Sequence, residues 1–188
     1  MILYINACVR EDSRTKRLAS CLLKTLNAPY TELNLGDCSF PRVDEAFLEK
    51  RDRLLREGEL SDPMFDLARQ FAEADEIVIA APFWDLSFPA TLKSYLEQIN
   101  VVGVTFRYTP EGIPQGMCRA GKLYYVTTVG GNFYPEQYGF GYVEALAGNL
   151  YGIKDVSLIK AQGLDIQGAP VEKLLLECEE DIARRFKG

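Results

Sequence analysis

The segment EIVIAAPFWDLSFPATLKSYLEQI (residues 76–99) joins an apolar run, an aromatic connection and a helix-like pattern. Residues 76–81 are apolar after Glu76 and rich in β-branched side chains, which predicts a strand buried on both faces of a parallel sheet. Residues 89–100 begin with Pro89 and repeat apolar side chains at helical spacing, as expected of a helix with proline in its first turn. A strand that leads directly into a helix is the repeating unit of α/β folds.

The same alternation continues on both sides of this segment. Further strands are predicted at residues 2–7, 30–35, 122–128 and 155–162, further helices at 13–28, 44–57, 62–74, 136–151 and 170–186, and a hairpin or irregular excursion at 104–116. Right-handed connections between five such strands favour an α/β, flavodoxin-like, doubly wound parallel sheet of order 2-1-3-4-5 with helices on both faces. With 188 residues, 47% of them apolar, we expect a single domain over residues 1–188.

The composition argues against several classes of function. The net charge is −6 and no Lys/Arg-rich patch stands out, which argues against nucleic acid and anionic membranes as partners. The longest uncharged apolar run, residues 77–84, is too short to span a bilayer, and the N-terminus lacks the basic start of a signal peptide. We therefore expect a cytoplasmic protein. Its five cysteines show no CxxC spacing, which favours reduced thiols over a metal site.

The sequence contains no histidine. This absence removes Ser–His–Asp and Cys–His nucleophile systems and zinc sites of the HExxH type, so we expect no metal. Any chemistry must be carried out by carboxylates, lysine, tyrosine, backbone groups or a cofactor.

The predicted strand order places three loops at one ligand crevice. In such sheets ligands bind at the carboxyl ends of the strands, where the order reverses between the first and third strands. Residues 8–15 and 81–88 border that point, with residues 128–135 beside them. Each loop has a distinct chemical character.

The first loop, ACVREDSRTKR, has no glycine-rich phosphate motif, but it places Arg10, Ser13, Arg14 and Thr15 around a helix start. Free N–H groups at a helix N-terminus, with hydroxyls and a guanidinium, form a phosphate cradle. The alternative is that Ser13 only caps the helix and the arginines are solvated.

The second loop carries Phe83, Trp84, Leu86 and Phe88, and Trp84 is the only tryptophan of the chain. An apolar wall at the crevice suits a flat ring system. Packing under a neighbouring helix, or burial by a partner subunit, would also explain these side chains.

The third loop, TTVGGNFYPEQYG, begins with Gly130 and Gly131 directly after a strand. Paired glycines let a ligand approach the backbone closely, although a tight turn explains them nearly as well. A phosphate at the first loop and a flat ring across the other two suit flavin mononucleotide (FMN).

Several segments resemble the FMN-dependent NADH azoreductases and the related NAD(P)H quinone reductases. These segments are APFWDLSFPATLKSYLEQI (81–99), GVTFRYTPEGIPQG (103–116), VTTVGG (126–131) and AQGLD (161–165). The resemblance implies a homodimer with FMN sites at the interface. It further implies that NAD(P)H, as co-substrate, reduces FMN, which then reduces a small aromatic acceptor such as a quinone, azo or nitro compound.

The resemblance also implies site residues. The phosphate contacts would be Arg10, Ser13 and Thr15; the flavin-ring contacts Pro82, Phe83, Trp84, Asp85 and Leu86; the third-loop contacts Thr128, Val129, Gly130 and Gly131; and the substrate contacts Phe106, Tyr108 and Tyr134. Tyr134 is the one candidate catalytic residue, in place of the tyrosine of a Tyr–His proton relay.

Three departures from the family pattern accompany the resemblance. The first loop has Cys8 and Val9 in place of the family's usual Ser-Pro-Arg opening. Val129 stands where azoreductases commonly carry an arginine, and no histidine is available to partner Tyr134. A flavodoxin-type electron carrier and a non-catalytic flavin-binding sensor are therefore the alternative functions. An acidic protein suits the first, because acidic surfaces dock basic redox partners.

Overall fold

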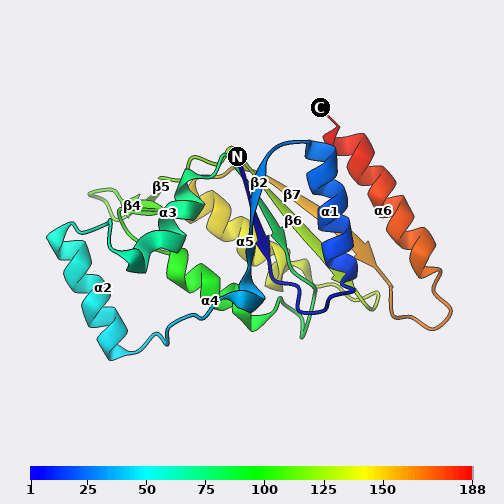
Figure 1. Cartoon of the computed structure of the whole chain (residues 1–188), viewed down its shortest axis with the longest axis horizontal. Helices are drawn as coiled ribbons and strands as arrows, with labels where there is room; N and C mark the ends of the chain where they lie inside the picture. Colours follow the sequence, from blue (N-terminus) through cyan, green and yellow to red (C-terminus); the bar gives the residue numbers. More distant parts are fainter. Residues whose placement is uncertain (188) are drawn as a thin grey trace.

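A computed structural model describes residues 1–187. The strands are β1 (Ile2–Asn6), β2 (Tyr30–Asn34), β3 (Glu76–Ala80), β4 (Phe106–Tyr108), β5 (Pro114–Gly116), β6 (Lys122–Val129) and β7 (Asp155–Gln162). The α-helices are α1 (Arg14–Leu26), α2 (Glu45–Glu57), α3 (Asp66–Glu73), α4 (Ala90–Ile99), α5 (Phe140–Leu146) and α6 (Val171–Phe186). The termini of the described chain lie toward the same edge of the molecule (Figure 1).

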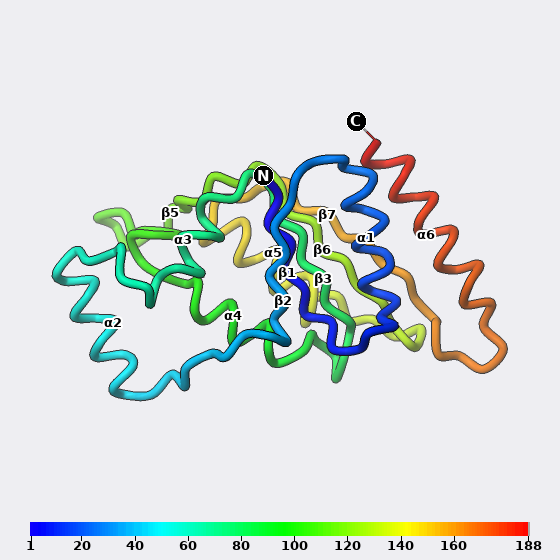
Figure 2. Tube along the Cα trace, viewed as in Figure 1, coloured from blue at the N-terminus to red at the C-terminus, as the bar shows by residue number. Residues whose placement is uncertain are grey.

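The five longer strands form one parallel sheet of order β2-β1-β3-β6-β7. Counted within this sheet, the order is 2-1-3-4-5, so the predicted flavodoxin-like fold is confirmed. Helices α1 and α6 cover one face, and α3, α4 and α5 cover the other (Figures 1 and 2).

Strand β3 shows why the sheet is buried on both sides. Its side chains alternate between the two hydrophobic cores: Ile77 and Ile79 face the α3/α4/α5 side, whereas Val78 and Ala80 face the α1/α6 side. All four are fully buried. An apolar residue at every position is what a central parallel strand requires.

Two predicted helices are divided in the structure. The segment predicted at 62–74 begins with a 3₁₀ turn, Pro63–Phe65, before α3 starts at Asp66. The segment predicted at 136–151 divides into a 3₁₀ turn (Glu136–Tyr138), α5 and a π-helical turn (Ala147–Tyr151). Gly139 separates the first two with a non-helical backbone, as glycine permits at low steric cost.

Strands β4 and β5 form a separate antiparallel hairpin, which agrees with the predicted excursion at 104–116. Gly116 lets the hairpin pack closely against Tyr151 and Gly152, because an added Cβ at this position would collide with their backbone. Helix α2 projects from the body of the molecule (Figure 1) and buries only Leu54 fully. None of the helices described in residues 1–187 is long and apolar enough to cross a membrane.

Candidate functional site at the carboxyl edge of the sheet

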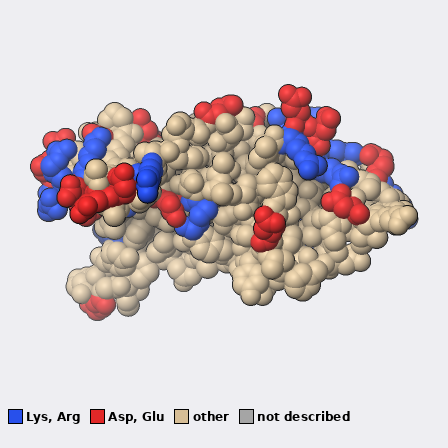
Figure 3. Space-filling view, turned by 90° about the horizontal axis from the view of Figure 1, so that it is seen from below, with Lys and Arg blue, Asp and Glu red and all other residues tan. Residues whose placement is uncertain are grey.

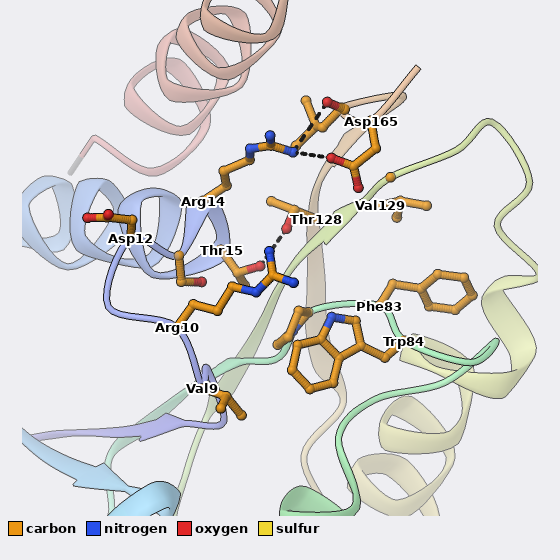
Figure 4. A pocket seen from close by; sticks show the side chains of 14 residues that line it. Val9, Arg10, Asp12, Arg14, Thr15, Phe83, Trp84, Thr128, Val129 and Asp165 are labelled. Carbon is orange, nitrogen blue, oxygen red and sulfur yellow. Dashed lines mark hydrogen bonds and ion pairs between the residues drawn. The ribbon is translucent and has the colours of Figure 1, made fainter. Parts of the chain in front are cut away.

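A cavity of about 230 Å³ opens at the carboxyl ends of β1, β3, β6 and β7 (Figure 4). The residues that line it are Val9, Arg10, Asp12, Ser13, Arg14, Thr15, Pro82, Phe83, Trp84, Thr128, Val129, Gly130, Leu164 and Asp165. The structure thus brings together nine of the twelve residues predicted to bind the cofactor: Arg10, Ser13, Thr15, Pro82, Phe83, Trp84, Thr128, Val129 and Gly130. The three loops that were predicted to border one crevice, residues 8–15, 81–88 and 128–135, all contribute to this cavity.

The polar corner of the cavity is built on the start of α1. Ser13 caps the helix, and its hydroxyl accepts a hydrogen bond from the Lys16 N–H at 3.2 Å. The Arg10 guanidinium extends across the cavity toward Thr128 (Figure 4). Within residues 1–187 it makes no ion pair. A cation beside a helix N-terminus gives this corner a positive potential.

Two hydroxyls tie the first and third loops together beneath this corner. The Thr15 Oγ1 and Thr128 Oγ1 atoms lie 2.6 Å apart, so one donates a hydrogen bond to the other. Thr15 is fully buried, whereas Thr128 is partly exposed to the cavity. Because each hydroxyl also has lone pairs, the pair offers a ligand an additional polar contact.

Phe83 and Trp84 form an aromatic wall of the cavity, which continues directly from β3. The Phe83 N–H donates to the Thr128 carbonyl at 3.1 Å, which extends the strand pairing by one more bond. Trp84 and Ser87 then exchange two backbone hydrogen bonds, of 2.9 and 2.7 Å, and close a tight turn. The wall is therefore anchored to the sheet on one side and to a turn on the other.

This turn has an unusual composition. Asp85 and Leu86 have φ values of 50° and 67°, the left-handed region that glycine and asparagine normally occupy. Trp84 is 40% exposed, whereas Phe88 packs against the core and lies 5.8 Å from the Tyr142 ring. Of the four apolar side chains of this loop, Phe83 and Trp84 line the cavity, Phe88 packs against the core, and Leu86 is exposed.

A fourth loop, residues 163–165 after β7, completes the cavity. Three backbone hydrogen bonds join it to the loop after β6: Gly163 N–H to Gly131 O (3.1 Å), Leu164 N–H to Val129 O (3.2 Å) and Asp165 N–H to Gly130 O (2.8 Å). The Arg14 Nη1 atom donates to Asp165 Oδ1 at 2.7 Å and to Leu164 O at 3.2 Å. The loop-based prediction did not include Leu164 and Asp165, although the same rule about the carboxyl ends of strands would have placed them at the cavity.

Three residues named as cofactor contacts do not line the cavity: Asp85, Leu86 and Gly131. Asp85 and Leu86 form the outer corners of the tight turn, and both side chains are exposed. Gly131 lies one residue beyond the cavity wall, where its carbonyl accepts the bond from Gly163.

Tyr134 lies behind the aromatic wall rather than in the cavity. Its ring meets Phe83 edge to face at 4.7 Å, and Lys160 Nζ lies 4.5 Å from its centroid. The hydroxyl is buried without a hydrogen-bond partner among the described residues. Burial, with a contribution from Glu136, raises the pKa of Tyr134 to about 12. Tyr134 therefore packs against Phe83 from behind, and its side chain does not line this cavity.

Phe106 and Tyr108 also lie outside the cavity, on strand β4 of the hairpin. Phe106 is buried, and its ring meets Tyr108 edge to face at 5.5 Å. Tyr108 is 56% exposed. Within one chain the hairpin therefore does not contribute to the site.

The one cysteine of the first loop, Cys8, is shielded from the cavity. Cys8 is buried beside β3, with its Sγ 3.8 Å from the Ala80 carbonyl, and burial raises the pKa of this thiol. It therefore stays protonated at neutral pH. Among residues 1–187, no group of three or more His, Cys, Asp or Glu side chains is placed to hold a metal ion.

A parallel sheet of this order, with a partly polar and partly aromatic cavity at its switch point, defines a flavodoxin-like ligand-binding protein. The family described as having the flavodoxin-like fold matches residues 1–186, and the chain belongs to that family.

The similar proteins are quinone oxidoreductases and an azoreductase by name. The FMN-dependent NADH:quinone oxidoreductase of Clostridium beijerinckii is 36% identical over 188 residues, which cover 94% of this chain and 93% of that protein. FMN-dependent NADH:quinone oxidoreductase 2 of Clostridium acetobutylicum is 42% identical over 199 residues, with 98% of each chain covered. The crystal structure of azoreductase from Bacillus anthracis has a TM-score of 0.85 at 24% identity, covering 99% of this chain and 98% of that one, which shows the shared fold. The family resemblance predicted from the sequence is confirmed.

Proposed function

We propose that the chain is an FMN-dependent NAD(P)H oxidoreductase that reduces quinones, azo compounds or similar small aromatic acceptors. The observation that carries this proposal is the union, in one cavity, of a cationic corner at a helix N-terminus with an aromatic wall. The names of the similar proteins support the same reaction.

The chemistry of the cavity residues fits FMN. Arg10, with Ser13 and Thr15 beside it, supplies a guanidinium and hydroxyls at a helix start, which suits a phosphate dianion. The partly exposed Trp84 offers an apolar face to a flat ring. The proposed FMN-binding residues are Arg10, Ser13, Thr15, Pro82, Phe83, Trp84, Thr128, Val129 and Gly130.

When bound, FMN would accept a hydride from NAD(P)H and pass two electrons to the acceptor. The protein residues would bind, orient and shield it. Arg10 and Ser13 would fix the phosphate end. Buried Pro82 and Val129 would exclude water from one side of the ring system. Such a reaction requires no histidine, because the cofactor would carry the electrons and the protein would only bind and orient it.

The purified protein tests this proposal directly. We expect FMN-loaded protein to show flavin absorption bands and to oxidise NADH rapidly when a quinone is added. Flavin binding with slow NADH oxidation and fast exchange with a redox protein would identify a flavodoxin-type carrier. Flavin binding without faster NAD(P)H consumption for any acceptor would identify a sensor. Absence of flavin binding would refute the proposal.

We further propose a homodimer. Val9, Phe133 and Tyr138, exposed by 66%, 72% and 56%, lie on the loops around the cavity and lack cover in the single chain. Seen from the carboxyl edge of the sheet, most charged residues gather toward the two ends of the molecule, and the middle carries few of them (Figure 3). A face with few charges and exposed apolar side chains is typical of a subunit interface.

In such a dimer the exposed Tyr108 of the hairpin is a candidate to line the partner's acceptor site, with Phe106 as its buried support. Light scattering at micromolar concentration tests the assembly: a dimer mass is expected, and a monomer mass would overturn it. Dependence on NAD(P)H supports a cytoplasmic location.

A further inference from the structure

The cavity contains an ion pair that the proposed function does not use. Arg14, the first residue of α1, binds Asp165 of the fourth loop at 2.7 Å (Figure 4). The two side chains are 40% and 70% exposed. Both line the same cavity as Arg10.

The position of Asp165 does not depend on Arg14. The three backbone hydrogen bonds of residues 163–165 to the loop after β6 hold the fourth loop to the sheet. Gly130 also makes room for the carboxylate, because an added Cβ there would collide with it. The backbone therefore holds residue 165 at the cavity wall without help from the ion pair.

The pair makes the two cavity arginines unequal. Arg14 is neutralised by Asp165, whereas Arg10 makes no ion pair among the described residues. The Asp12 carboxylate points away from Arg10 and from the cavity centre (Figure 4). A single effective cation remains, on the Arg10 side.

We infer that Asp165 is a specificity-determining residue: by neutralising Arg14 it leaves Arg10 as the one cavity arginine without an ion pair, and it lowers the affinity for phosphate-bearing flavins. This inference rests on the proposed function.

Calorimetric titration of the flavin-free protein with FMN and with riboflavin, which lacks the phosphate, tests the inference. Asp165→Asn keeps the side-chain shape and removes the charge. Because an exposed ion pair is weak, freeing Arg14 should raise FMN affinity only by about fivefold at low salt. Riboflavin affinity should change by less than twofold, and the FMN gain should shrink at high salt.

Arg14→Gln is the matched second variant. In the parent protein it should lower FMN affinity by about fivefold at low salt, because it leaves the Asp165 carboxylate unpaired in the cavity, and it should change riboflavin affinity by less than twofold. Combined with Asp165→Asn, it should abolish the fivefold gain. Weaker FMN binding in Asp165→Asn, an equal change for riboflavin, or no change at all would overturn the inference.

Different results would overturn the proposed function and the proposed role of Asp165. If the parent protein binds neither FMN nor riboflavin, the proposed function is wrong. If the parent binds FMN and Asp165→Asn does not bind it more tightly, only the role of Asp165 is wrong. Urea unfolding of each flavin-free variant shows whether a change in affinity reflects a damaged fold.

Discussion

Replacing Trp84 with alanine removes most of the aromatic wall from the cavity. Trp84 is the only tryptophan of the chain, it lines the cavity, and it is 40% exposed. Its backbone is held by two hydrogen bonds to Ser87, which do not involve the indole. The substitution therefore removes ligand-contacting surface and leaves the turn in place.

The expected loss follows from the exposed area. A tryptophan side chain presents about 250 Å², so the 40% exposed fraction corresponds to about 100 Å². If a flavin ring covers half to all of this area, at about 25 cal/mol per Å², binding loses about 1.2 to 2.5 kcal/mol. The FMN dissociation constant should rise about 8-fold to 70-fold.

The assay is titration of FMN, followed by quenching of its own fluorescence, against parent and variant proteins. Trp84→Phe should retain most of the affinity because it keeps a flat ring. Leu86→Ala is the matched control: Leu86 lies in the same turn and is 47% exposed, but it does not line the cavity. Equal FMN affinity in Trp84→Ala and the parent, or an equal loss in Leu86→Ala, would refute the reasoning.

Three further predictions follow from the cavity and the core. Arg10→Gln should weaken FMN binding by about 10-fold to 100-fold, the value of a charge-assisted hydrogen bond, and leave riboflavin binding unchanged in the same titration. Tyr134→Phe should keep kcat/KM for quinone reduction within twofold from pH 6 to 9, because the hydroxyl is buried and its pKa is raised to about 12; a tenfold loss would identify it as a proton donor. The free energy of unfolding should fall above about pH 10 by about 1.4 kcal/mol per pH unit for each buried tyrosine, because burial raises the pKa in the folded chain and only the unfolded chain loses protons there. Chemical unfolding between pH 8 and 11 measures this effect, and unchanged stability would contradict it. The tyrosines concerned are Tyr4, Tyr95, Tyr125 and Tyr151.

The fold could be predicted because its signals are local. The short apolar run from Ile77, rich in β-branched side chains, predicts a central strand, and Ser13 and Pro89 mark helix starts that the structure places within one residue. Helix interiors were harder to predict. Gly139 divides the predicted helix 136–151, and the sequence shows only that a glycine is present, not which backbone conformation it takes.

The site could be predicted at the level of loops but not of every side chain. Strand order alone brings residues 10, 84 and 128 to one edge, so their meeting follows from topology. Which way a side chain points within a loop depends on turn geometry. Asp85 and Leu86 were expected at the flavin, yet a left-handed turn directs the chain away after Trp84.

The contribution of Asp165 depends on a contact between segments 151 residues apart in sequence. Local pattern gives no sign of such a pair. The collision that a Cβ on Gly130 would cause appears only once β6 and β7 lie side by side. Charged groups on loops are therefore the part of the site that the structure adds.

Trp84 is also a natural reporter of the central claim that four loops form one flavin cavity. Its fluorescence, excited selectively at the red edge of tryptophan absorption, can be followed while FMN is added to the flavin-free protein. The account predicts strong quenching that saturates at one FMN per chain. Bound FMN with unchanged tryptophan fluorescence would place the flavin elsewhere and contradict the account.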